Sequence, residues 1–543
     1  KVPSTSHHHH HSSDRMTSLL LLLLLHLAFV DVSSIIDGLV VYPIPNSNWW
    51  NGYPYKYDVY LQPEGSSEKQ RAYAYYSAPS AATSKNTLQS GKTVSWTTFS
   101  FDDVKLNLGV RVTVVANTGW KECIITPLAL GIDCIPSGDG YSASFVITKA
   151  MTKVSVEFDP PAPNDISRAT SVVRDALLIF ADPLEQSLEL APSDPYYYGP
   201  GDQTIGCITV PANQTVYVAG GAYLRGGFKT EYGTDDVTIR GRGVITVEDG
   251  AYTGCSDTHS LVFICGGEGV KIEGVTAVAT VYGAIGGHIG GNTYFGNCNI
   301  DPVPGQGLVV SNVKVMGWQY AADGIFVGRH GKVSDSFIRV NDDATVDYQS
   351  HQIWQRNIIW QLDNGWPFLM QWNTWDGYEP VPALNGVTNV VVKDSIVVHV
   401  EQLPIGNYNI GCADGTNRYD GNHRSIFGAW QGESNVVQNI TFENIVVEGG
   451  LWTMPFYLHV GDSPFSETQC SCCSNGQINN ILFKNINFQY WAAQWSNISG
   501  NVAKGGLVSN IEFQNISIDG TRMKSSDQMH LVIGAGAHGV RVV

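Results

Sequence analysis

Short runs of alternating apolar and polar residues occur along most of the chain, separated by Gly, Pro, Ser and Asn. In the first third, the clearest runs are residues 57–61, 71–76, 94–101, 110–115, 142–147 and 154–158. Alternation with a period of two is typical of β-strands with one buried face, and closely spaced turns favour an antiparallel sandwich. We therefore predict a β-sandwich domain over residues 35–186.

A different pattern begins near Val210, where a turn residue and a short apolar alternation recur as a unit. The clearest copies start at Gly269, Asn389, Asn439, Asn480 and Asn510, and each has a second Gly, Asp or Asn five residues later. No long helical pattern separates the copies, so the strands must follow one another through turns. Short strands stacked coil upon coil form a parallel β-helix, which we predict for residues 187–543. Asn suits the turns because it tolerates left-handed backbone, and Asn side chains can form ladders between coils.

The first 34 residues are expected to lie outside the fold. Met16 precedes an apolar stretch of about a dozen residues beginning at Leu19, which suits a secretory signal and is shorter than the ~20 residues of a membrane span. His7 to His11 in front of it resemble a purification tag or translated upstream sequence. We predict a leader and signal peptide over residues 1–34, a secreted extracellular protein, and no membrane attachment after cleavage.

The composition of the chain limits the classes of molecule that it is expected to bind. The 543 residues carry 32 Lys plus Arg against 49 Asp plus Glu, for a net charge of -17. Nucleic acids and anionic membranes need a basic face, so neither is expected as a partner. The 57 glycines and the 11% aromatic content indicate many turns and many flat apolar surfaces, which suit a neutral polysaccharide. We expect a monomer that binds a polysaccharide.

Ten cysteines fit a secreted protein, in which an even number favours disulfides over a metal site. Spacing alone does not fix the pairing, although Cys123 with Cys134 and Cys255 with Cys265 are close enough for local loops. The four Asn-X-Ser/Thr sites predict glycosylation on exposed turns; they are Asn213, Asn439, Asn497 and Asn515.

Three carboxylates stand out in the segment 317–348: Asp323 within Ala-Ala-Asp-Gly, and the adjacent Asp342 and Asp343 within Val-Asn-Asp-Asp-Ala. The 19 residues between Asp323 and Asp342 amount to about one coil, so stacking at ~4.8 Å brings the two side by side. Neighbouring residues in a straight strand point to opposite faces, so Asp342 and Asp343 share a cleft only where the strand bends. Asp pairs are common in plain turns. Here apolar strands flank the pair and a third Asp lies one coil back.

Clustered carboxylates repel one another, which raises at least one pKa and leaves another group ionised. This division suits glycoside cleavage, in which an acid protonates the leaving oxygen and a second carboxylate acts as base or nucleophile. The chemistry requires no metal or other cofactor, and no spacing of His residues demands one.

Aromatic residues surround the three carboxylates. Part of them must be core, because Trp is commonly buried, and the rest would provide flat surfaces for pyranose rings. The residues that we predict to bind substrate are Trp318, Tyr320, Tyr348, Trp366, Trp372 and Trp375.

At these residues the sequence resembles glycoside hydrolase family 49, the dextranases and isopullulanase. The matching motifs are Asp323-Gly324 and Val340-Asn-Asp342-Asp343-Ala344, together with segments 198–201, 220–228 and 425–429. The resemblance implies an N-terminal β-sandwich followed by a right-handed parallel β-helix, and internal cleavage of an α-glucan with inversion. It implies Asp342 as general acid, with Asp323 and Asp343 positioning and activating water. Where the family carries a Glu and a Lys, this chain has Phe326 and Val346, which leaves the particular glucan open.

Two alternatives follow from the same residues. A polygalacturonase also uses an Asp beside an Asp pair, but the chain lacks the usual combination of Gly-His-Gly and a downstream Arg-x-Lys. A catalytically inactive, carbohydrate-binding β-helix is the other, and the altered neighbours at Phe326 and Val346 favour it. A calcium-dependent lyase would need a strongly basic residue beside a carboxylate metal site.

Overall fold

The computed structural model describes most of the chain after the predicted leader. The described residues are 36–47, 56–77, 94–160, 176–185, 190–247, 255, 260–280, 283–287, 305–319, 322–346, 348–362, 364–371, 386–401, 408–411, 417–420, 424–432, 434–461 and 475–543. The leader and the boundary between residues 186 and 187 lie outside them. Within them, the only helices are the 3-10 turns η1 (Leu128–Leu130) and η3 (Val502–Lys504). No helix in this part of the chain is long and apolar enough to cross a membrane.

The first strands form two mostly antiparallel sheets that pack face to face. One sheet contains β1 (Leu39–Val41), β4 (Tyr75–Ser77), β5 (Val94–Phe101), β7 (Cys123–Thr126), β10 (Thr152–Phe158) and β11 (Ala176–Pro183). The other contains β2 (Tyr57–Pro63), β3 (Gln70–Ala72), β6 (Val110–Ala116), β8 (Ile135–Pro136) and β9 (Ser142–Ile147). Every second residue of β2 and β6 is buried, and these residues meet Phe99 and Ile179 of the first sheet in one apolar core.

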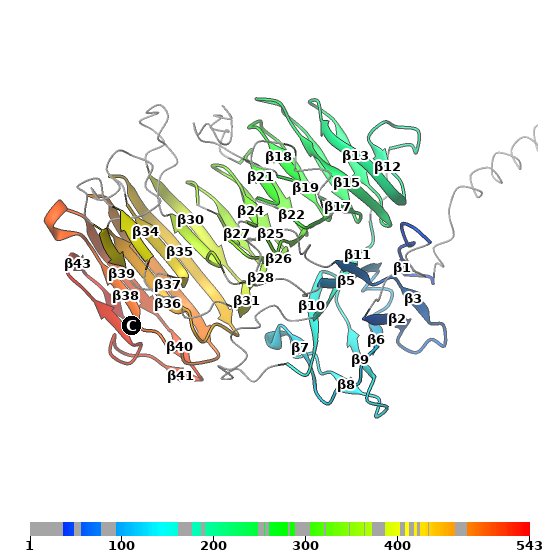
Figure 1. Cartoon of the computed structure of the whole chain (residues 1–543), viewed down its shortest axis with the longest axis horizontal. Helices are drawn as coiled ribbons and strands as arrows, with labels where there is room; N and C mark the ends of the chain where they lie inside the picture. The colour runs from blue at the N-terminus through cyan, green and yellow to red at the C-terminus, as the bar shows by residue number, and fades with distance from the viewer. Residues whose placement is uncertain are drawn as a thin grey trace, which may run out of the picture.

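The later strands pair in parallel along three faces of a β-helix (Figure 1). The first face contains β14 (Thr215–Val218), β16 (Thr238–Gly241), β19 (Lys271–Glu273), β22 (Val309–Ser311), β25 (Lys332–Ser334), β27 (Ile353–Gln355), β30 (Val387–Lys393), β35 (Val436–Val447), β37 (Gln477–Phe488) and β39 (Leu507–Gln514). The second contains β15 (Ala222–Lys229), β17 (Val244–Thr246), β20 (Thr276–Val278), β23 (Lys314–Met316), β26 (Phe337–Val340), β28 (Ile358–Gln361) and β31 (Ile396–Val400), and continues into the ends of β35 and β37 and into β40 (Ser517–Ile518).

The third face contains β18 (Val262–Ile264), β21 (Ile285–Gly287), β24 (Ile325–Phe326), β29 (Phe368–Gln371), β34 (Ser425–Gln431), β36 (Met454–Val460), β38 (Ser496–Ser499) and β42 (Leu531–Ile533). The remaining strands lie at the ends or outside the coils: β12 (Tyr197–Tyr198), β13 (Gly201–Thr209), β32 (Tyr408–Gly411), β33 (Asn417–Asp420), β41 (Thr521–Arg522), β43 (Ala537–His538) and β44 (Arg541–Val542). The predicted fold class, a β-sandwich followed by a right-handed parallel β-helix, is confirmed.

The repeated turn residues have the backbone conformation that the repeat predicts. Both turn positions of all five copies have positive φ, from 52° at Asn515 to 80° at Gly274. The side chains form ladders from coil to coil, as in the 2.8 Å bond from Asn485 Nδ2 to Asn444 Oδ1. The turns therefore recur because only residues that tolerate left-handed backbone fit there.

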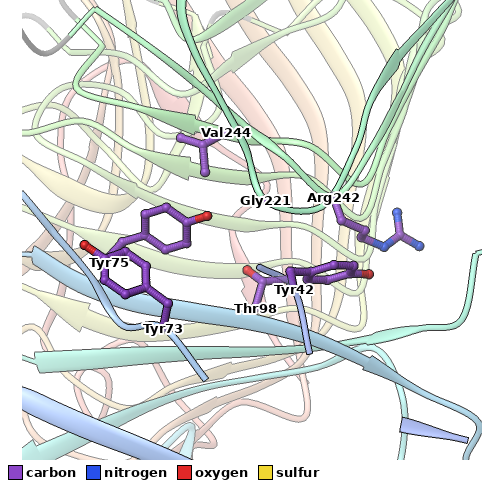
Figure 2. Close-up of a pocket in the computed structure, with 7 residues that line it drawn as sticks. All are labelled: Tyr42, Tyr73, Tyr75, Thr98, Gly221, Arg242 and Val244. Atoms are coloured by element: carbon purple, nitrogen blue, oxygen red, sulfur yellow. The ribbon is translucent and has the colours of Figure 1, made fainter. Parts of the chain in front are cut away.

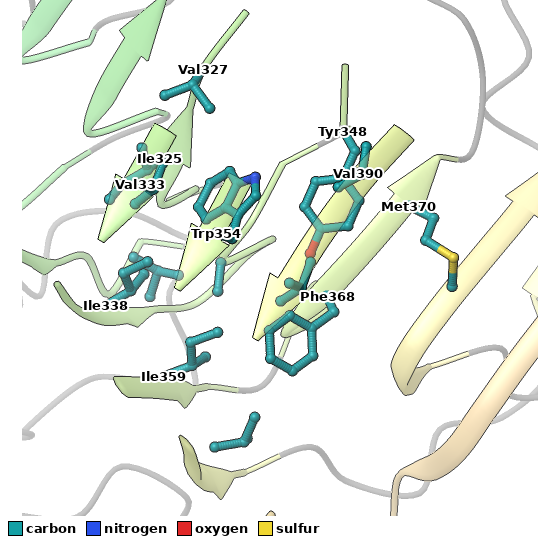
Figure 3. Close-up of a cluster of buried hydrophobic side chains, with 14 of the residues drawn as sticks. Ile325, Val327, Val333, Ile338, Tyr348, Trp354, Ile359, Phe368, Met370 and Val390 are labelled. Atoms are coloured by element: carbon teal, nitrogen blue, oxygen red, sulfur yellow. The ribbon is translucent and has the colours of Figure 1, made fainter. Parts of the chain in front are cut away.

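Apolar side chains from all three faces fill the interior of the coils. Figure 3 shows part of this core, where the Trp354 and Tyr348 rings lie among Ile325, Val333 and Phe368. Phenylalanines of successive coils stack, with 5.2 Å between the ring centres of Phe442 and Phe483 and 8° between their planes.

The sandwich packs against the second face of the β-helix. Apolar side chains of both units form one cluster, in which Phe180 contacts Phe337 with ring centres 5.3 Å apart. The buried Asp182 carboxylate accepts a hydrogen bond from Lys314 Nζ at 2.5 Å. A cavity of about 10 Å³ lies at this interface. Figure 2 shows the side chains that line it, among them tyrosines of the sandwich and Arg242. The cavity has room for about one water molecule and is too small for a sugar.

The disulfides agree with one local pairing and correct the other. Cys123 bonds to Cys134, as predicted. Cys255 bonds to Cys207 instead of Cys265, which is itself disulfide-bonded. Close spacing misleads at Cys255, because stacking brings the coil that carries Cys207 next to it.

Candidate active site

The three carboxylates meet where the third face passes from β24 to β29. Ile325 forms a parallel bridge with Thr345, an offset of 20 residues that puts Asp323 in register with Asp343. The N–H of Asp342 donates to the carbonyl of Ala322, and the N–H of Gly324 donates to the carbonyl of Asp343, both at 2.9 Å. In a regular parallel ladder, a single residue opposite residue 323 would both donate its N–H to the carbonyl of residue 322 and accept the N–H of residue 324. Two residues therefore oppose one, as in a β-bulge, and this bulge is the bend that the sequence requires.

The bulge gathers the carboxylates of Asp323, Asp342 and Asp343. One oxygen from each lies within 4.8 Å of the others. Oδ1 of Asp323 accepts the N–H of Asp343 at 3.1 Å, and Oδ1 of Asp343 accepts the N–H of Trp366 at 2.7 Å. Asp343 is only 3% exposed, whereas the other two are half-buried. Backbone N–H groups of two coils thus fix the directions of two carboxylates.

A short segment of the next coil supports the bulge. The side-chain amide of Gln361 donates to the carbonyls of Asp342 and Asn364, each at 2.7 Å. Asn364 Nδ2 donates to Oδ2 of Asp342 at 2.8 Å. Gly365 has a φ of 57°, and a Cβ there would lie 2.2 Å from the carbonyl carbon of Asp342. Only glycine allows the two backbones to approach this closely.

The electrostatics distinguish Asp342 from an ordinary surface carboxylate. Burial raises the pKa of Asp342 to about 7, although the Arg424 charge and the hydrogen bonds from Asp343 and Asn364 oppose the rise. Desolvation disfavours the ionised form, and the opposing contacts are too few to restore it. Asp342 therefore keeps its proton up to near-neutral pH.

Arg424 is a site residue that the sequence analysis misses. Its side chain is 4% exposed, and its Nη2 donates to Oδ1 of Asn364 at 3.2 Å. It directly precedes β34, whose first residues form the segment 425–429 quoted for the resemblance. The 82 residues between Asp342 and Arg424 hide their proximity in the sequence. The signal that could have found Arg424 is its position directly before that segment.

The predicted aromatic surfaces require correction. Trp318, Tyr348 and Trp366 are 4%, 0% and 1% exposed, so their rings do not offer a face to a sugar. Trp318 packs between the β-helix and the sandwich, and Tyr348 lies inside the coils, where its hydroxyl is 3.1 Å from Thr345 Oγ1. Trp366 packs against other buried side chains, Trp430 and Tyr457 among them. Tyr320, Trp372 and Trp375 lie outside the described residues.

The predicted glycosylation sites differ in exposure. Asn213, Asn439 and Asn515 are exposed at left-handed turns, whereas Asn497 is half-buried within β38. Asn439 also belongs to an Asn ladder, in which its Oδ1 accepts a 2.6 Å bond from Asn480 Nδ2. Glycan attachment at the four sites stays a prediction.

Among the described residues, the three site carboxylates are also the group arranged to hold a divalent cation, since their oxygens converge within 4.8 Å. Oxygen ligands of this kind suit calcium or magnesium. A carboxyl with a raised pKa in the same cluster also suits acid–base chemistry, which needs no ion.

The sequence and the structure were compared with those of known proteins. No family model matches the sequence. The chain is 23% identical over 431 residues to a dextranase of Arthrobacter globiformis and 24% identical over 427 residues to a dextranase of Arthrobacter sp. (strain CB-8). Each match spans 66% of this chain and 62–63% of the relative. The solved structure of Dex49A from Penicillium minioluteum superposes with a TM-score of 0.60 at 16% identity, covering 95% of this chain and 96% of the other.

The resemblance to glycoside hydrolase family 49 is confirmed. The structural match shows a shared fold over almost the whole chain, whereas the sequence motifs that carry the resemblance are concentrated in the β-helix. The Asp323-Gly324 and Asp342-Asp343 motifs are also the residues that form the bulge.

Proposed function

We propose that the protein is a secreted glycoside hydrolase that cleaves internal linkages of an α-glucan of the dextran type. Two observations support the substrate class: the relatives are named dextranases, and the net charge of -17 suits a neutral polymer. The apolar stretch after Met16 supports secretion. The observation that carries the reaction type is the group of three carboxylates within 4.8 Å, one with a strongly raised pKa.

Asp342 acts as the general acid in this proposal. A catalytic acid works best with a pKa near the operating pH, and burial raises the pKa of Asp342 to about 7. Asn364 donates to Oδ2 and holds the carboxyl in place, and the acid proton passes from Asp342 to the glycosidic oxygen. Leaving-group protonation is the step that the raised pKa serves.

Asp323 and Asp343 position and activate the attacking water. Their Oδ1 atoms accept backbone N–H bonds of 3.1 and 2.7 Å, which favour the ionised, acceptor form of a carboxylate. One oxygen of each carboxylate lies within 4.8 Å of the others, whereas carboxyl groups are typically ~6.5–9.5 Å apart in inverting enzymes and ~5–5.5 Å apart in retaining ones. Inversion therefore rests on the family resemblance, and covalent attack by a carboxylate is the competing mechanism.

The first experiment measures reducing ends released from dextran, pullulan and polygalacturonate by the wild type and by Asp342→Asn. We expect cleavage of dextran and a loss of about 10³-fold or more in kcat for Asp342→Asn, with binding retained. Cleavage of polygalacturonate alone would support a pectin hydrolase. Equal turnover by both proteins would refute the role of Asp342, and no turnover on any polymer would favour an inactive carbohydrate-binding protein.

The second experiment follows the anomer of the first-formed product by NMR. Inversion of the cleaved α-linkage yields a β-anomer. An α-anomer would show retention and replace water activation by nucleophilic attack.

A further inference from the structure

The last coils of the β-helix carry an exposed aromatic group unlike the aromatics of the active site. Trp491 and Trp495 are 37% and 57% exposed. The His530 ring stacks on Trp495 with ring centres 4.8 Å apart and 12° between the planes. It also lies 5.0 Å from the Trp491 ring. We call these three residues the C-terminal aromatic group.

The group lies on the same edge of the same face as the active site. Trp495 directly precedes β38 and His530 directly precedes β42, while Arg424 directly precedes β34. The register of β34 with β36 and of β36 with β38 puts Trp495 level with Ile426, two residues beyond Arg424, and β38 pairs with β42, all in parallel. Figure 1 shows β34, β36 and β38 on neighbouring coils towards the C-terminal end.

The distance to the carboxylates follows from this stacking. The N–H of Trp366 binds Asp343, and Trp366 lies two residues before β29, which pairs with β34. Four coil-to-coil steps separate Asp343 from Trp495, and steps of ~4.8 Å give roughly 19 Å along the axis. A few glucose units in line span this distance.

The chemistry of the group favours a neutral sugar chain. Exposed indole faces bind the C–H faces of pyranose rings, and the stacked His530 ring restricts the rotation of Trp495, which lowers the entropy lost on binding. Val532 of β42 is 45% exposed and is in register with Asn497, two residues after Trp495, so it extends the apolar surface along the same coil. Two indoles and one aliphatic side chain form a patch much smaller than a stable protein interface.

We propose that Trp491, Trp495 and His530 form a remote subsite that binds the glucan chain beyond the active site, towards the C-terminal end of the β-helix. The identity of the ligand rests on the proposed function. The subsite would help the protein to hold a polymer during internal cleavage, and it would not serve a substrate too short to reach it.

Binding is tested separately from cleavage. In the Asp342→Asn background, titration calorimetry measures the affinity for an α-1,6-linked glucose trisaccharide and for the corresponding octasaccharide. We expect Trp495→Ala to weaken octasaccharide binding roughly five- to tenfold, with the trisaccharide unchanged, as loss of an aromatic contact implies. Trp495→Phe should restore most of the affinity. The control Tyr232→Ala removes a ring that is 60% exposed in the coils near the other end and should change neither affinity.

In the active enzyme, Trp495→Ala should raise KM for dextran by a similar factor and leave kcat and Tm unchanged. Equal octasaccharide binding by Trp495→Ala and Tyr232→Ala would overturn the subsite. Equal weakening of trisaccharide and octasaccharide binding would also overturn it, because the effect would then be structural.

The two proposals fail separately. Dextran cleavage without any effect of Trp495 refutes the subsite and leaves the proposed function standing. Binding of the octasaccharide that depends on Trp495, without cleavage by the wild type, refutes the proposed function and supports the subsite.

Discussion

Gly365 provides the sharpest test of the active-site geometry, because it touches the bulge through its backbone alone. In Gly365→Ala, the added Cβ would lie 2.2 Å from the carbonyl carbon and 2.6 Å from the Cα of Asp342, and 2.3 Å from the nitrogen of Asp343. Ordinary contacts begin at 3.4 Å. The substitution therefore forces the two coils apart at Asp343 and at Asp342, the proposed general acid.

The size of the effect follows from these distances. Relief of the closest contact, from 2.2 to 3.4 Å, needs a displacement of about 1 Å. A misplacement of about 1 Å in a catalytic group costs on the order of 10²-fold in rate. The positive φ of 57° adds about 1–2 kcal/mol of backbone strain for alanine. We expect kcat on dextran to fall about 10²-fold and stability to fall by ~2–4 kcal/mol, the strain plus the overpacking.

The assay compares kcat and urea unfolding of Gly365→Ala with those of Gly505→Ala. Gly505 has a φ of 83°, and a Cβ there meets nothing within 4 Å, so this control has the backbone strain without the collision. We expect Gly505→Ala to keep full kcat and to lose ~1–2 kcal/mol of stability. If Gly365→Ala retained more than half of the wild-type kcat, the bulge would not be held by this contact and the reasoning would be wrong.

Two further predictions concern charge. The alkaline limb of kcat/KM should lie near pH 7, because the acid must be protonated. Arg424→Met should move this limb to higher pH, since the Arg424 charge lowers the pKa of Asp342; an unmoved limb would contradict this charge effect. Asp182→Asn should cost ~3–5 kcal/mol in urea unfolding, because it strands the buried Lys314. The half-exposed pair of Asp202 and Arg225 is the control, and Asp202→Asn should cost ~0–1 kcal/mol.

Local chemistry explains why much of the fold could be predicted. The turn positions of the repeat, such as Asn439 and Asn444, need left-handed backbone, and few residue types supply it. Alternation in 57–61 and 110–115 likewise reports burial on one face. Both patterns depend only on residues that are close together in the sequence, so they can be recognised without the structure.

The supporting residues of the site could not be predicted in the same way. Asn364 bonds to Asp342, and Arg424 bonds to Asn364, only because coils stack, and the register depends on insertions whose lengths vary. The 19-residue spacing suggested Asp323 beside Asp342, whereas the offset of 20 aligns Asp323 with Asp343, and the bulge then brings in Asp342. The direction of an aromatic ring depends on the same register, so the sequence alone does not show that Tyr348 lies in the core.

The packing of β26 explains what the sandwich contributes to the site. All four residues of β26 are buried: Ile338 and Val340 face the interior of the coils, while Phe337 faces the sandwich and meets Phe180. A strand buried on both faces is held more firmly than one with a solvated face. The bulge begins two residues after β26 ends, so a rigid β26 restricts the movement of Asp342 and Asp343. The N-terminal domain therefore stabilises the geometry of the carboxylates through β26, and undocking it should loosen the bulge before it disturbs the C-terminal coils.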